Sequence, residues 1–121
     1  MTYEILRLFN VSERLLLLSK EIKYITNNLV PAKERHLKLI EVAWRLENIS
    51  DGIVITIASR LQPEKEDIPL TKREQKGIVD AIDAAKECVS MIEEAALAES
   101  KKKLIEIIET AEIILLPYKE N

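Results

Sequence analysis

Turn-forming residues are scarce in this chain of 121 residues, which has two glycines and four prolines. Sandwiches, barrels and chains of short hairpins turn often and use these residues at many of their turns. The sequence therefore excludes an all-β fold. The length is that of about one domain, so we expect residues 1–121 to form a single unit.

The sequence also lacks a second cysteine, an excess of basic residues and long apolar runs. A single cysteine, Cys88, excludes an intramolecular disulfide framework and a CxxC metal pair, as suits a reducing cytosol. Eighteen Lys and Arg against 21 Asp and Glu leave no basic excess to neutralise nucleic acid. No apolar run approaches the ~20 residues that span a bilayer, and the N-terminus lacks the basic start of a signal peptide. We therefore expect a cytoplasmic protein without a membrane span, reaching a membrane only through a partner.

Helix-forming residues dominate what is present. Ala, Glu, Lys, Leu and Arg make up 61 of the 121 residues, the share expected of long helices. Apolar residues recur at steps of three and four, the spacing of one helical stripe. These patterns predict an all-α fold, an up-down antiparallel bundle of three or four helices. The expected helices cover residues 3–28, 31–61, 71–97 and 100–116, with a polar loop at 62–69.

Local signals set the expected helix ends. Pro31 stands where the second helix begins, because its missing N–H costs nothing there. Thr71 and Glu74 have the spacing of a capping box at the start of the third helix. Ser100 is a candidate cap for the fourth. Neither Gly nor Pro marks the joint near Ala98, so the third and fourth helices could also be continuous.

Four consecutive leucines, residues 15–18, stand out in the first expected helix. At about 100° per residue they point around the whole circumference, so some of them face away from a simple core. Either this helix is buried on all sides, or the outward leucines form a subunit contact. We expect self-association as a homodimer.

Two acids of the second expected helix fall on its apolar side. At about 100° per residue, Glu47 lies near 100° and Asp51 near 140° from Leu46, in an arc that Trp44 and Val54 extend. Carboxylates one turn apart repel each other, and an unpaired buried one costs several kcal/mol. Either a Lys or Arg of a neighbouring helix pairs with them, or they line a wet groove, or they ligate a divalent metal.

The segment around these acids resembles the PhoU-like family. Residues 46–54, Leu-Glu-Asn-Ile-Ser-Asp-Gly-Ile-Val, are similar to the family's L-E-R-I-G-D-x-h-x signature. Residues 67–74 and 81–87 resemble phosphate transport regulators and the PhoU-like domain of sodium/phosphate cotransporters. The likeness covers roughly residues 35–97 and follows the order of an E-x-x-x-D helix, a proline-bearing loop and a D-x-x-x-D helix.

This resemblance implies a PhoU-like bundle that regulates phosphate transport and binds iron, manganese or magnesium through clustered acidic motifs. The residues that match the motifs are Glu47 and Asp51 on the second helix, and Asp83 and Glu87 on the third. On a helical wheel Asp83 and Glu87 share the polar face of their helix. They would therefore meet the other two acids only in a surface cluster or under a second subunit.

Two classes of function remain. A non-enzymatic regulator or adaptor of phosphate transport or signalling would dock a helix face on a phosphate transporter or sensor protein. A small metal-dependent phosphoanhydride hydrolase would need an acidic cluster with open coordination; Glu106, Glu109 and Glu112 supply one E-x-x-E helix but no second E-x-x-D helix accompanies it. The lone His36 and the absence of a glycine-rich phosphate loop support no nucleophilic catalysis. We expect the regulator, without catalytic residues.

Overall fold

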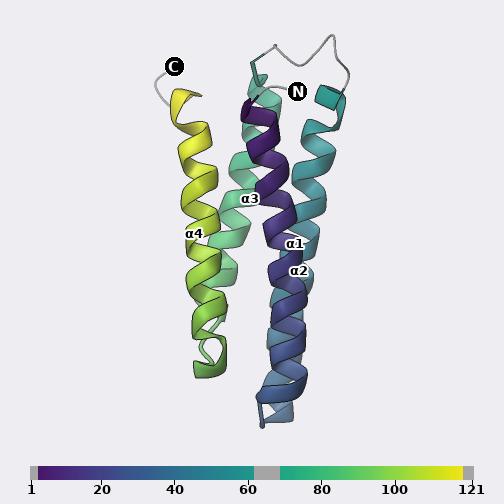
Figure 1. Ribbon diagram of the computed structural model, residues 1–121, viewed down its shortest axis with the longest axis vertical. Coiled ribbons are helices and arrows are strands. Elements are labelled where there is room, and N and C mark those ends of the chain that lie inside the picture. Colours follow the sequence, from purple (N-terminus) through teal and green to yellow (C-terminus); the bar gives the residue numbers. More distant parts are fainter. Residues whose placement is uncertain (1–2, 62–68, 119–121) are drawn as a thin grey trace.

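The computed structural model describes residues 3–61 and 69–118 (Figure 1). In these residues the chain forms no strand, and its long elements are α1 (Tyr3–Leu29), α2 (Lys33–Ile57), α3 (Lys72–Met91) and α4 (Ala98–Leu115). Short 3₁₀ turns complete it: η1 (Ala58–Leu61), η3 (Ala95–Leu97) and η4 (Leu116–Tyr118). Successive helices run in opposite directions (Figure 1). The predicted all-α, up-down bundle is confirmed, with four helices.

The four helices form a closed ring in which α1 packs against α2 and α4, and α3 packs against α2 and α4. The first hairpin is the longer one, with helices of 27 and 25 residues against 20 and 18 in the second. Its tip extends beyond the tip of the α3–α4 hairpin at the lower end of Figure 1. Part of the α1–α2 hairpin is therefore left without cover from the other two helices.

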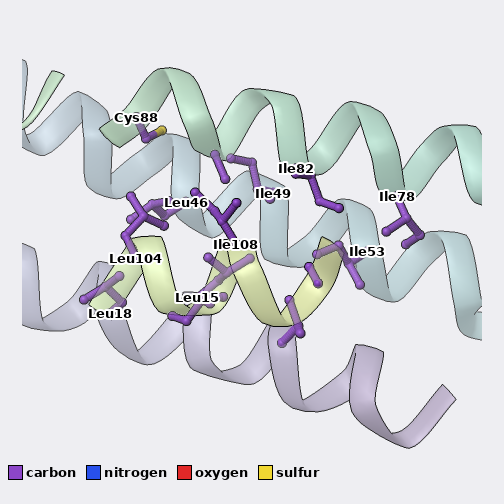
Figure 2. Close-up of a cluster of buried hydrophobic side chains, with 14 of the residues drawn as sticks. Leu15, Leu18, Leu46, Ile49, Ile53, Ile78, Ile82, Cys88, Leu104 and Ile108 are labelled. Carbon is purple, nitrogen blue, oxygen red and sulfur yellow. The ribbon is translucent and has the colours of Figure 1, made fainter. Parts of the chain in front are cut away.

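Leucine and isoleucine side chains from all four helices fill the core. Figure 2 shows Leu15 of α1, Leu46 of α2, Ile82 of α3 and Ile108 of α4 pointing into the same interior; each is buried. Among them remains a void of about 10 Å³, lined only by apolar side chains. Such a void holds about one water at most, so it has no room for a larger ligand.

Small polar residues line the seam between α1 and α2. Ser12 Oγ donates to the Ser50 carbonyl at 3.0 Å, and Ser50 Oγ donates to the Ser12 carbonyl at 2.7 Å. Both serines are buried, and seven-residue steps from Ser12 lead to the equally buried Ser19 and Thr26. Small side chains let two helix backbones approach closely, and the reciprocal hydrogen bonds fix the axial register of the hairpin.

A polar network ties the elements at the upper end of the bundle in Figure 1. Arg60 Nε donates to Glu74 Oε2 at 2.9 Å, and Arg60 Nη2 donates to Glu74 Oε1 and to the Pro69 carbonyl. Tyr118 Oη donates to Glu4 Oε1 at 2.6 Å and accepts a hydrogen bond from the Leu70 N–H at 3.1 Å. The start of α1, the turn η1 after α2, the start of α3 and the turn η4 after α4 are thus held together.

The start of α3 agrees with the prediction, whereas the start of α2 differs from it. Thr71 and Glu74 form the expected capping box, with both reciprocal hydrogen bonds present. Helix α2 begins at Lys33, two residues after Pro31, with Ala32 as its N-cap. The predicted loop at 62–69 falls on residues 62–68, which lie outside the described residues, and on Pro69.

The joint between α3 and α4 lies earlier than predicted. Helix α3 ends at Met91, not near residue 97, because Ile92 adopts an extended backbone (φ −92°, ψ 104°). This break lets Ile92 and Leu97 both insert into the core. The two helices are therefore not continuous. Ser100 is not the cap of α4; Leu97 holds that position, and Ser100 is buried inside the helix.

Candidate functional site

Glu47 and Asp51 are less buried than the helical wheel predicted. Glu47 lies at the outer side of the α1–α2 seam, where Lys23 Nζ donates to its Oε2 at 3.1 Å, and its side chain is 42% exposed. Asp51 is exposed. The expected burial is wrong because the apolar arc is narrower than assumed: Trp44, which extended it, is 63% exposed. A lysine of a neighbouring helix pairs with Glu47, one of the alternatives that the sequence left open.

Asp83 and Glu87 lie on the exposed face of α3, as their helical positions predicted. Glu87 Oε2 is 3.5 Å from Arg45 Nη1, and Arg45 also pairs with Glu41 at 3.1 Å. Arg45 therefore links Glu41 of α2 to Glu87 of α3.

The structure does not bring the four predicted ligands together. Arg45, which contacts Glu87, and Glu47, which contacts Lys23, are two residues apart and so point to opposite sides of α2. Within residues 3–61 and 69–118, no group of three or more His, Cys, Asp or Glu side chains could hold a metal ion. Glu47, Asp51, Asp83 and Glu87 therefore form no such cluster in the described part of the chain.

The remaining reactive side chains serve structural roles. Burial raises the pKa of the Cys88 thiol to about 11, so the thiol is protonated at neutral pH and is a poor nucleophile. His36 Nε2 hydrogen-bonds the Val30 carbonyl at 2.7 Å and holds the turn between α1 and α2. Of the E-x-x-E residues on α4, Glu112 pairs with Lys86 at 3.3 Å.

One acid that the sequence did not single out joins α1 to α4. Glu21 accepts hydrogen bonds from Ser100 Oγ at 2.8 Å and from Lys103 Nζ at 2.6 Å. Burial by itself raises the pKa of Glu21, but the hydrogen bonds from Lys103 and Ser100 outweigh it and hold the pKa below its usual range. The signal available in the sequence was Ser100, a polar residue on the buried side of its helix.

The surface feature that calls for explanation is apolar. Large exposed hydrophobic side chains form one stripe on α1 and one on α2, at steps of 11 and 7 residues that keep each stripe on one side of its helix. Half-buried residues lie between the stripes. On α1 they are Phe9, Leu16 and Lys23, and on α2 they are Ile40, Glu47 and Val54, each seven residues from the next. We call this surface the hairpin face: exposed Leu6, Leu17, Tyr24, Leu37, Trp44 and Ile55, with half-buried Phe9, Leu16, Ile40 and Val54.

The leucine run contributes to this face as the sequence predicted. Leu15 and Leu18 are buried in the core, whereas Leu17 points outward on the hairpin face. Trp44, in contrast, was expected to pack inside the bundle and lies on the surface. Large apolar side chains exposed in this number on two neighbouring helices mark an interaction site more often than a catalytic one.

No helix of the described residues is long and apolar enough to cross a membrane. Comparison with protein-family models, curated proteins and solved structures gives no match for this chain.

Proposed function

We propose that the protein is a non-enzymatic adaptor that acts through contacts of its hairpin face and serves the regulation of phosphate transport. One observation carries the adaptor role: of the eleven large hydrophobic side chains exposed among the described residues, six lie on the hairpin face. Monomeric proteins rarely leave such a surface uncovered without a binding role. The link to phosphate transport is supported by the resemblance of residues 46–54 and 81–87 to PhoU-like proteins.

The alternative, a small phosphoanhydride hydrolase, has less support in the geometry. Such an enzyme needs clustered carboxylates beside a pocket that admits substrate. Here Glu47 pairs with Lys23, Glu87 pairs with Arg45, and the two pairs lie on opposite sides of α2. The void of about 10 Å³ in the core is too small for a substrate, and the groove of about 600 Å³ beside Arg35 and Glu94 contains none of these four residues.

The adaptor role predicts a phosphate phenotype that depends on the hairpin face. Cells lacking the protein should keep phosphate uptake high in phosphate-rich medium, because the transporter has lost its regulator. The wild-type chain should restore control, a Leu37→Glu/Trp44→Glu variant should not, and Ile113→Glu, at an exposed site of α4, should restore it.

Uptake that is unchanged by loss of the protein would refute the phosphate role. Release of phosphate from pyrophosphate by the purified protein, lost in Glu47→Gln/Asp51→Asn, would favour the hydrolase.

Metal binding by Glu47 and Asp51 stays a prediction of the family resemblance, and melting experiments test it. If the family resemblance holds, iron(II), manganese or magnesium should raise the wild-type melting temperature, because a ligand bound only by the native state stabilises it. If Lys23 alone balances Glu47, the melting temperature should stay unchanged. Glu47→Gln/Asp51→Asn should cost less than about 1 kcal/mol, since Glu47 forms a surface ion pair. Asp83→Asn/Glu87→Gln is the matched control. A metal-dependent rise that only Glu47→Gln/Asp51→Asn removes would establish ligation.

A further inference from the structure

We draw no further inference here: the strongest candidate, the apolar hairpin face of α1 and α2, rests on the exposure of its side chains alone, because nothing in the described part of the chain shows whether a second copy or another partner covers it.

Discussion

Replacing Arg60 by methionine is expected to lower the free energy of unfolding by about 3–5 kcal/mol. The side chains of Arg60 and Glu74 are only 5% and 13% exposed, so the change leaves a carboxylate unpaired in a nearly dry site. It also removes a donor to the Pro69 carbonyl. Urea denaturation followed by circular dichroism at 222 nm measures the loss.

Arg45→Met is the matched control for this variant. Arg45 is 44% exposed and pairs with Glu41 and Glu87 at the surface, so its loss should cost less than about 1 kcal/mol. Equal effects of the two substitutions would show that the Arg60–Glu74 pair is no stronger than a surface pair. Arg60→Met/Glu74→Gln should recover part of the loss, because no buried charge then lacks a partner.

The same pair makes the bundle sensitive to acid. The hydrogen bond from Arg60 lowers the pKa of Glu74 below its ordinary value of 4.5 and outweighs burial, which raises it; bonds from Thr71 lower it further. A carboxyl whose folded pKa is depressed contributes stability above its unfolded pKa and loses it as the pH falls through the folded pKa. Melting temperatures between pH 7 and 3 should therefore fall more steeply for wild type than for Glu74→Gln. Parallel curves would contradict this assignment.

Leu46→Ala is the second substitution for which we expect a large loss, of about 2–5 kcal/mol. The Leu46 side chain is 0% exposed and belongs to the buried core drawn in Figure 2. Its truncation removes buried apolar surface and leaves a cavity that packed neighbours fill only in part. Urea denaturation at low micromolar protein gives the value.

Leu37→Ala is the same chemical change on the same helix at a side chain that is 81% exposed. It should alter monomer stability by less than about 0.5 kcal/mol. The contrast separates burial from helix propensity, which is identical for the two variants. Comparable losses would mean that Leu46 is not part of a rigid core.

Local sequence rules predicted much of this fold. The spacing of apolar residues in α2 predicted which side of the helix is buried. The Thr71 capping box was predicted from Thr71 and Glu74 alone. Both features depend only on residues close together in the sequence. The apolar positions predicted closest to Leu46 on the wheel are all buried: Leu39, Val42, Ile49, Ile53 and Ile57.

The features that the sequence predicted poorly are those that depend on how neighbouring helices are placed. Trp44 and Asp51 are seven residues apart and share one side of α2, and whether that side is covered is decided by where α1 and α3 lie. The Ser12–Ser50 and Glu21–Ser100 contacts join residues 38 and 79 positions apart, beyond any local rule. The same limit applied to the candidate ligands, since acidic spacing within one helix says nothing about where the acids of another helix point.

The closure of the ring by α4 has a consequence for synthesis on the ribosome. Glu21 reaches Ser100 across 79 residues, and Glu4 reaches Tyr118 across 114. Until α4 has emerged, the side of α1 that it covers, including buried Val11 and Leu18, stays open to water. Because the N-terminal part of a chain leaves the ribosome first, the nascent chain exposes this surface to chaperones and to other nascent chains. The nascent α1–α2 hairpin therefore carries two apolar sides, and only one of them is later closed by its own chain.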